Sequence, residues 1–504
     1  MNKRWYNYRP ILLFFIFLIL GTLFAFYVQD NRAASIGVIV PIFILVSIVA
    51  ICKKKLNYLL IPTIAFLIAG ASFYLAVSNF NKAVKTAPEI IEARVYSITE
   101  VEQGMLRFKA DTCKFDGKSI DTNINVLLYD YDSLFADLQI GMIVKFKPSK
   151  FYKADLKHGK TPNSKMFSED LKYTVTANVT QFEVIGTNTT FVEQIKQKIK
   201  DNLGGGLTSE NMELAYSALF GDKDFLNETQ YSSYRLSGIA HLLAVSGLHV
   251  SIIVAIISAL LNAFKFNGWL KLAIVSLFLI FYAYLCNFSV SVIRAGVMSL
   301  MLMLSVLLKR EYDALSALGL AGIIIFFLNP LCVFDVSFLM SFACVLGIIL
   351  FSKPISALFH KCKMPKKLAD SMAITTSTLI SLLFISAYFF NNFNLISLIA
   401  NLIIIPIFTL AFSIMFVVSI ISLALPAISV VLIPLNYVFD LINVLATVLG
   451  GLSFANFSTA KLEFLAIPLY FVLLFSLSRI SVAKYRNKII ISIPLVAILM
   501  ICLI

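Results

Sequence analysis

Long apolar runs separated by short polar turns make up most of this chain of 504 residues, outside one polar region between residues 80 and 235. A helix of roughly 20 apolar residues crosses a hydrocarbon layer of about 30 Å. The pattern therefore predicts a polytopic α-helical membrane protein of about 13 spans. Three spans are expected at residues 11–28, 35–52 and 58–78, and about ten more from residue 236 onward.

The polar region has a different periodicity. Five short segments, rich in β-branched residues and separated by Asp, Gly and Ser, show the rough alternation of apolar and polar positions that is typical of strands. They cover residues 90–98, 104–110, 123–129, 142–147 and 173–185. Five strands of this length predict a small β-barrel, with an OB-like barrel as one option.

A Lys-rich helical stretch at residues 191–203 follows the predicted barrel, and Gly204, Gly205 and Gly206 after it indicate a hinge. We therefore expect four parts along the chain. They are an N-terminal membrane anchor at 1–79, an extracytoplasmic β domain at 80–190, an amphipathic helical linker at 191–235 and a transmembrane bundle at 236–504.

Composition agrees with a membrane protein. Hydrophobic residues make up 59% of the chain and charged residues 14%, whereas a soluble domain has roughly 25% charged residues. The formal net charge is +14. In a soluble protein this excess would suggest a polyanionic partner, but retention of Lys and Arg on the cytoplasmic side produces the same excess in a membrane protein.

Basic residues fall in alternate loops. With the N-terminus in the cytoplasm, five predicted inner loops carry Lys or Arg, and the predicted outer loops are nearly uncharged. The inner-loop residues are Lys53, Lys54, Lys55, Lys265, Lys271, Lys309, Arg310, Lys353, Lys361, Lys363, Lys366, Lys367, Arg479, Lys484, Arg486 and Lys488. The positive-inside rule then predicts a multi-pass protein of the bacterial cytoplasmic (inner) membrane with residues 80–235 outside. This parity needs two crossings between residues 395 and 450, where prolines indicate broken helices.

The stretch GIAHLLAVSGLHVSI at residues 238–252 places His241 and His249 at the start of a predicted span. Ionisable groups inside spans are costly and usually face the bundle interior or water. Hydrogen bonds to neighbouring helices are one explanation. A metal pair is disfavoured, because eight residues turn a helix by about 800°, which leaves the two side chains roughly 80° apart. We expect no metal site and no cofactor.

Ser246 and Gly247 in the same stretch resemble part of a hydrolase elbow. Ala244 and Leu248 stand where that motif has its two glycines, so a serine hydrolase is disfavoured. Gly247 is better explained as a point of helix bending or of close approach by another backbone.

Arg294 lies about five residues inside another predicted span, where an arginine costs several kcal/mol unless it is paired or wetted. Snorkelling to the outer surface is one explanation, and contact with a backbone phosphate is the other, because a guanidinium matches phosphate geometry. Asp335 is a candidate partner for Arg294, and Asn401 lies near the start of a later span. Together with His241, these residues would form a funnel in the outer half of the membrane.

The predicted barrel has its own candidate surface for single-stranded DNA. Lysines that follow a nucleic-acid backbone, beside aromatic rings that stack on bases, are the components of such a surface. The candidate residues are Lys145, Lys147, Lys150, Phe151, Tyr152 and Lys153. A solvated loop that faces anionic lipid headgroups explains the same pattern equally well.

At residues 238–250 the sequence closely resembles the ComEC family of competence proteins, whose most recognisable string has the form G-x-x-H-L-L-A-[VI]-S-G-L-H-V. Two further elements of the family are similar to residues 218–222 and 291–298 of this chain, and the second of these includes Arg294. A later element departs from the family pattern, with Ser337, Leu339 and Met340 where Gly, Gln and Leu are usual.

The resemblance implies an inner-membrane channel that imports single-stranded DNA into the cytoplasm during natural transformation. It would act with a DNA receptor and a nuclease on the outer side and with a cytosolic ATPase or helicase, because the chain has no P-loop. The chain shows no HxHxDH string, so we expect no nuclease activity and no enzyme. A homo-oligomer is left open. The alternatives are an ion-coupled transporter of a small solute or lipid, and a membrane hydrolase that uses Ser246.

Overall fold

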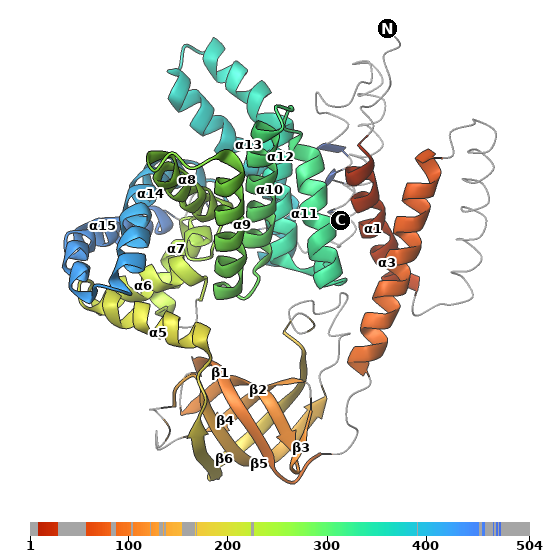
Figure 1. The fold of residues 1–504 in the computed structure, drawn as a ribbon, viewed down its shortest axis with the longest axis vertical. Helices are drawn as coiled ribbons and strands as arrows, with labels where there is room; N and C mark the ends of the chain where they lie inside the picture. Colours follow the sequence, from red (N-terminus) through yellow and green to blue (C-terminus); the bar gives the residue numbers. More distant parts are fainter. Residues whose placement is uncertain are drawn as a thin grey trace.

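In the computed structural model, the chain forms a helical bundle, a β-barrel and a layer of short helices between them (Figure 1). The structure describes residues 9–28, 57–81, 87–153, 167–222 and 226–452, apart from short breaks inside these ranges, and a few positions between 456 and 474. The expected spans at 35–52 and beyond 474 lie outside the described residues.

The bundle contains most of the helices. Their bounds are α1 (Pro10–Val28), α3 (Asn57–Asn81), α8 (Gly247–Ala263), α9 (Gly268–Leu285), α10 (Val290–Leu307), α11 (Ala314–Leu328), α12 (Val336–Lys361), α13 (Lys366–Phe390), α14 (Ser397–Ser422) and α15 (Leu435–Gly450). Among the described residues, six of these helices are long and apolar enough to cross a membrane: α3, α9, α10, α12, α13 and α14. The membrane character of the chain is therefore confirmed, whereas the number of about 13 spans stays a prediction.

Two features limit the number of spans that can be counted within the described residues. The helices α1, α8 and α11 are apolar but shorter than a full crossing. In the part of the chain that the structure describes, a seventh crossing arises if the 3₁₀ helix η3 (Pro426–Leu432) and α15 form one span, and the angle between these two helices is 47°. The region that prolines interrupt is thus one continuous helix, α14, which contains Pro406, followed by this bent pair.

The barrel occupies one end of the molecule (Figure 1). Its strands are β1 (Ile91–Val101), β2 (Met105–Phe115), β3 (Lys118–Ser119), β4 (Asn123–Tyr129), β5 (Met142–Lys153) and β6 (Leu171–Thr187). Neighbours follow the order β1-β5-β6-β4-β2, and a further pairing of β1 with β2 closes the sheet. The pair β4–β6 is parallel, and the other pairs are antiparallel. The five predicted strands are therefore confirmed as a closed barrel.

Alternation along the strands explains the barrel core. On β4, Ile124, Val126 and Leu128 are buried and the residues between them are partly exposed. Inward aromatic rings such as Phe108 and Phe146 pack around Phe182 on β6. This period of two is the pattern that the sequence shows at these positions.

The basic turn between α12 and α13 lies at the end of the bundle that faces away from the barrel (Figure 1). It carries Lys361, Lys363, Lys366 and Lys367. The placement agrees with a barrel and a basic turn on opposite sides of a membrane. Which side faces the cytoplasm stays a prediction from the positive-inside rule.

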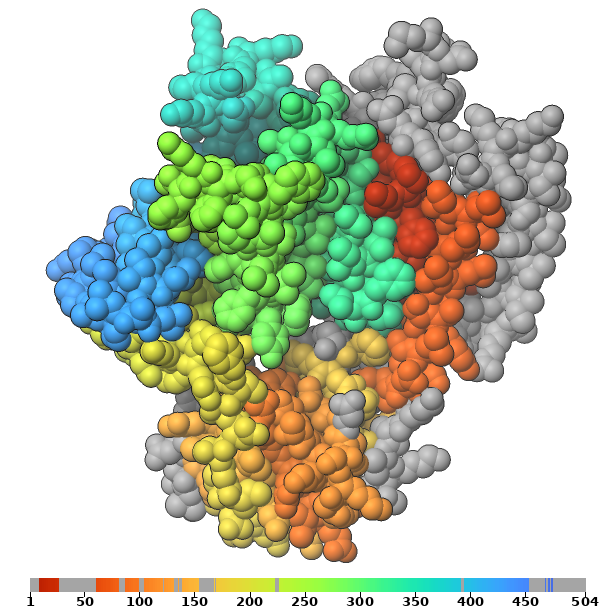
Figure 2. All heavy atoms as spheres, viewed as in Figure 1, coloured from red at the N-terminus to blue at the C-terminus, as the bar shows by residue number. Residues whose placement is uncertain are grey.

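Three helices, α5 (Phe191–Gly204), α6 (Ser209–Phe220) and α7 (Glu228–Leu236), form the layer between barrel and bundle. Figure 2 shows this segment, in yellow, filling the space between the orange barrel and the green and blue bundle. Buried side chains of the layer, such as Leu203 and Tyr234, belong to the same core as Val250 of α8 and Phe408 of α14. The layer is therefore packed against the bundle.

The glycines after α5 make a tight contact in place of the hinge that we expected. A Cβ on Gly206 would lie 2.0 Å from the carbonyl oxygen of Ser429 in η3. The carbonyl of Gly206 also accepts a hydrogen bond of 3.0 Å from Asn436 Nδ2 on α15. Because both sides of Gly206 are packed, its lack of a side chain serves close approach.

Candidate functional site

The stretch at residues 238–252 forms a turn, the 3₁₀ helix η1 (Ala240–Leu242) and the first part of α8. Gly238 has a φ of 77°, and a Cβ there would lie 2.4 Å from the Cβ of Ser397 at the start of α14. Glycine is thus required both by the backbone conformation and by the contact. The turn fixes where α8 begins, next to α14.

Ser246 is the N-cap of α8, and its hydroxyl accepts a hydrogen bond of 3.2 Å from the N–H of Leu248. The backbone N–H of Ser246 donates to Nδ1 of His249 at 2.8 Å, so the two residues form a reciprocal capping box. The Ser246 hydroxyl also lies 3.0 Å from the same Nδ1. Local capping thus accounts for both polar side chains.

His249 is fully buried. Because Nδ1 accepts the N–H of Ser246, a neutral ring carries its proton on Nε2. Nε2 is buried without a hydrogen-bond partner, and the ring centroid lies 4.5 Å from that of Phe412 and 5.4 Å from that of Phe408 on α14. His249 therefore joins the start of α8 to α14 through its cap and its ring contacts.

Arg294, on α10, reaches the same point from the opposite side. A Cβ on Gly247 would lie 2.7 Å from Nη2 of Arg294, so the guanidinium touches the first turn of α8. Arg294 is 6% exposed, which excludes snorkelling to the surface in this conformation. Its Nε is buried without a partner. We call Ser246, Gly247, His249 and Arg294 the α8–α10 centre.

Asp335 does not pair with Arg294, contrary to our expectation. Its Oδ1 accepts hydrogen bonds from the backbone N–H groups of Ser337, at 2.7 Å, and Phe338, at 3.2 Å, and thereby caps α12. Within the described ranges the structure contains no ion pair between Asp335 and Arg294. The cap fixes the Asp335 carboxylate at the start of α12.

The remaining predicted bundle residues lie at helix starts. His241 is exposed on η1, and Asn401 is partly buried in the second turn of α14 with its Oδ1 unpartnered.

The one acid within α15, Asp440, is exposed and bonded to Asn211. An ion-coupled transporter favours a buried acid at mid-membrane, and Asp440 does not have that position.

On the barrel, the candidate DNA-binding residues separate into two groups. Lys147, Lys150, Tyr152 and Lys153 are exposed on β5, and Tyr152 is 53% exposed. Lys145 is partly buried and lies 3.9 Å from Glu92. The Phe151 ring packs 4.7 Å from Tyr173 and 5.8 Å from Phe115. Phe151 is therefore partly buried against the barrel core, and stacking of its ring on a base stays a prediction.

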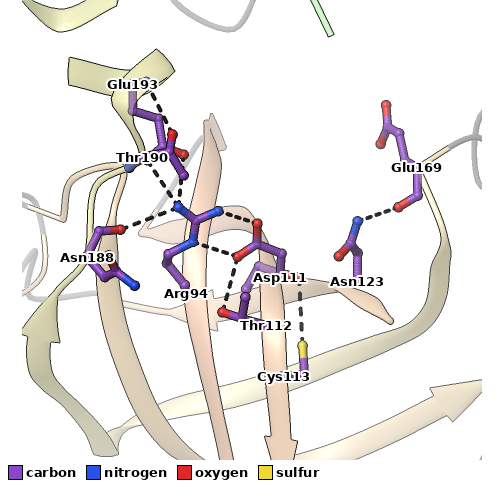
Figure 3. A network of polar contacts seen from close by, with 10 residues as sticks. Arg94, Asp111, Thr112, Cys113, Asn123, Glu169, Asn188, Thr190 and Glu193 are labelled. Carbon is purple, nitrogen blue, oxygen red and sulfur yellow. Dashed lines mark hydrogen bonds and ion pairs between the residues drawn. The ribbon is translucent and has the colours of Figure 1, made fainter. Parts of the chain in front are cut away.

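A buried ion-pair network, which we did not predict, joins the barrel to α5 (Figure 3). Arg94 on β1 donates to both carboxylate oxygens of Asp111 on β2, with Nε at 2.8 Å, and its Nη1 lies 3.2 Å from Glu193 on α5. The hydrogen bond with Asp111 raises the pKa of Arg94 above its ordinary value, although burial acts in the opposite direction. The T-x-x-E capping signature of Thr190 and Glu193 was a visible signal for this helix start.

A polar stripe on α15 was also missed. Asn436, Asp440 and Asn443 recur at intervals of four and three residues, which places them on one helix face. Asn211 of α6 donates to Asp440 at 2.8 Å and to Asn436 at 3.2 Å, and Tyr234 of α7 donates to Asn443 at 2.8 Å. The stripe holds α15 on the layer of short helices.

The fold and the α8–α10 centre define a membrane protein that has a bundle of apolar helices, an extramembrane barrel and a buried arginine at a helix start. Comparison with known proteins gives its family. The family model described as "Competence protein" matches residues 218–482, more than half of the chain. The chain belongs to this family of competence proteins, as the resemblance to the ComEC proteins indicated.

Three relatives illustrate the similarity. The chain is 27% identical over 203 residues to the ComE operon protein 3 of Bacillus subtilis. The matched stretch covers 40% of this chain and 25% of that protein. It is 27% identical over 157 residues to the Recombination protein 2 of Haemophilus influenzae, and the match covers 30% of this chain and 19% of that protein. It is 32% identical over 189 residues to an uncharacterized protein of Aquifex aeolicus, and the match covers 37% of this chain and 42% of that protein. The matches thus span less than half of each relative, and no solved structure matches the chain.

Proposed function

We propose that this protein takes part in DNA uptake during natural transformation and that its bundle is a channel that passes single-stranded DNA into the cytoplasm. Membership of the competence protein family carries the proposal. The architecture supports it, because a bundle of membrane-length helices is joined to a folded barrel at one end (Figure 1).

The barrel is the proposed first contact for the strand. Its strand order, with the third and fifth main strands parallel, is the arrangement of an OB-type barrel, a fold that often binds oligonucleotides. Lys147, Lys150 and Lys153 are exposed along β5, as is Tyr152. Such a row neutralises backbone phosphates while an aromatic ring stacks on a base. The other explanation, a loop at anionic lipid headgroups, predicts that the same lysines bind vesicles.

The proposed path through the membrane begins near His241 and Asn401 and passes the α8–α10 centre. The centre supplies a rigid helix start, since Ser246 and His249 fix the first turn of α8. Arg294 brings a positive charge to that turn. A strand whose backbone carries one negative charge per nucleotide meets a favourable potential there.

The proposed partners follow from what the described residues offer. We propose a DNA receptor and a nuclease on the outer side and an ATPase or helicase in the cytosol, with the chain as a passive, non-enzymatic channel in the bacterial inner membrane. The Ser246–His249 contact uses Nδ1, which also accepts a backbone N–H. A hydrolytic dyad would need that nitrogen as a free base, supported by an oriented third group.

The test of this function is genetic. In a transformable strain that carries the gene, an in-frame deletion is supplied with labelled double-stranded DNA, and nuclease-sensitive and nuclease-resistant label are counted separately. We expect the surface-bound, sensitive fraction to remain and the internal, resistant fraction to disappear, with recovery when the gene is restored. An unchanged resistant fraction in the deletion strain contradicts the proposal.

A further inference from the structure

The first turn of α8 presents positive charge. The helix is 17 residues long, and the N-terminus of a helix carries roughly half of a positive elementary charge on its free N–H groups. Ser246 occupies the N–H of Leu248. The N–H of Gly247, the first of the helix, has no acceptor in the part of the chain that the structure describes. One donor at this end of α8 is therefore available.

The Arg294 guanidinium lies against this same turn. Its Nη2 is 2.7 Å from the place where a Cβ on Gly247 would be, so only a glycine lets the two groups come this close. None of its nitrogens finds an acceptor among the described residues, and its Nε is fully enclosed. A buried guanidinium without a counter-charge is costly. It stands beside a second positive group, which adds to the cost.

The described neighbours leave both groups without compensation. Asp335, the candidate partner of Arg294 in the sequence, caps α12 instead. His249 offers no acceptor either, since its Nδ1 is occupied by the N–H of Ser246. The rings that His249 contacts, Phe408 and Phe412, are apolar, and the thiol of Cys344 near Arg294 is at most a weak acceptor. A bound anion would satisfy the guanidinium and the helix terminus at once.

We propose that Arg294 and the backbone N–H of Gly247 form a binding site for one phosphate-type oxyanion. A guanidinium offers paired donors that match two oxygens of such a group, and the N–H of Gly247, which has no acceptor among the described residues, adds one donor at the same turn. The two sources of this chemistry are a phosphodiester of a DNA strand and free inorganic phosphate. The diester source rests on the proposed function, whereas the site itself does not.

The first experiment uses the full chain in lipid nanodiscs, with inorganic phosphate and a labelled oligothymidylate as probes. We expect phosphate, relative to chloride at equal ionic strength, to raise the melting temperature of the wild type. We expect Arg294→Gln to remove this effect and to weaken oligothymidylate binding by roughly 10-fold or more, the loss typical of one charged hydrogen-bonding group. The matched control is Arg310→Gln, an exposed arginine just beyond the other end of α10.

A second variant keeps the charge and changes only the geometry. In Gly247→Ala the new Cβ displaces Nη2, so phosphate stabilisation should fall although Arg294 is present. Wild type that melts at the same temperature in phosphate and in chloride overturns the site, whatever the variants do. Equal phosphate effects in wild type and Arg294→Gln overturn it as well.

The two proposals fail in different ways. If phosphate stabilises the wild type only through Arg294, while Arg294→Gln imports DNA normally in cells, the site stands and its ligand is the free anion. If Arg294→Gln abolishes import while phosphate binding is unchanged, the oxyanion site is wrong and the channel survives. An oligothymidylate with a neutral methylphosphonate backbone should not compete in the wild type, and competition by it overturns the diester as the ligand.

Discussion

Arg94 of β1 and Glu193 of α5 form an ion pair of 3.2 Å that joins the barrel to the helical layer. The side chains are 9% and 18% exposed, so solvent screens the pair little. Glu193 also accepts the N–H of Thr190 at 2.7 Å. One carboxylate thus holds both the helix start and the barrel.

This pair predicts how firmly the barrel is attached. Arg94→Met leaves Asp111 and Glu193 without their partner, and we expect a loss of about 3 kcal/mol in the free energy of opening at residues 188–193. Glu193→Gln keeps an acceptor for the cap and should cost about 1 kcal/mol. Hydrogen exchange of the full chain measures both values. Lys145→Met is the control, because its contact with Glu92 is 3.9 Å long and both side chains are partly exposed to solvent.

The exposed lysines of β5 predict a salt-dependent affinity for single-stranded DNA. Replacing Lys147, Lys150 and Lys153 together by Gln removes up to three phosphate contacts. The slope of log K against log salt should then fall by about 2 units, since each contact on a single strand contributes roughly 0.7. The measurement is a fluorescence titration of the full chain at several salt concentrations.

Two comparisons sharpen the test of the β5 lysines. Lys114→Gln with Lys118→Gln removes exposed charge from β2 and β3, and this control should leave most of the slope intact. Tyr152→Ala should lower affinity with little change in slope, because stacking is not ionic. Equal losses in the β5 variant and the control would show that only net charge matters, which contradicts a defined strand path.

The polar stripe predicts that Asn211 is important for stability. Asn211→Ala removes the side-chain donor that bonds Asn436 and Asp440, so the two acceptors on α15 lose these hydrogen bonds. We expect a cost of about 1–3 kcal/mol, seen as a lower melting temperature in detergent. Thr447→Ala is the control, because its exposed hydroxyl only bonds the carbonyl of Asn443 in its own helix. A melting temperature equal to that of the wild type would show that α15 is held by its apolar face alone.

The contact of α1 with α11 should weaken in acid. Asp313, in the turn before α11, pairs with Arg9 at 2.7 Å. Burial raises the pKa of Asp313, but hydrogen bonds from Arg9 and Ser316 outweigh it and hold the pKa below the ordinary value of 3.8. A lowered folded pKa stabilises the folded state above the ordinary value, and this stabilisation is lost as pH falls through the folded pKa.

The matched variant for this pH effect is Asp313→Asn. The difference in melting temperature between wild type and Asp313→Asn should be constant above about pH 5 and should shrink as pH falls below about 4. Because other carboxylates titrate alike in both proteins, the difference isolates this pair. A difference that stays constant down to about pH 2 would contradict the assignment.

The periodicity of the sequence predicted much of this architecture. Alternation of apolar and polar positions identified the five main strands, because every second side chain of a strand, such as Ile124 and Val126, faces the barrel core. Apolar length identified the helices from α8 to α14, although α8 and α11 are shorter than a crossing. An apolar run in the sequence does not show whether its helix is buried inside the protein or crosses the membrane, because both kinds of helix are apolar on every side.

The site was less predictable, for a physical reason. The sequence drew attention to Arg294 and His249, since buried ionisable groups are rare in apolar runs. It did not indicate the local cap between His249 and Ser246, because the usual capping box has Glu or Gln at that position. It could not show that Gly247 would receive the guanidinium, because this contact depends on how α8 and α10 are placed. The sequence also did not indicate that Phe151 packs against the barrel core, because its neighbours alternate irregularly, with a register shift between β5 and β6 near Pro148.

The orientation of the barrel and the basic turn can be tested with one natural cysteine. Cys362 is exposed in the turn between α12 and α13, among lysines that the positive-inside rule places in the cytoplasm. In a variant with Cys52 and Cys502 replaced by Ser, an impermeant maleimide should label Cys362 only after the membrane is opened. A second variant, with Cys362→Ser and Lys150→Cys, should be labelled in intact spheroplasts. Labelling of both positions from the same side would show that the barrel and the turn share a compartment, which is incompatible with a strand that enters at the barrel and leaves into the cytoplasm.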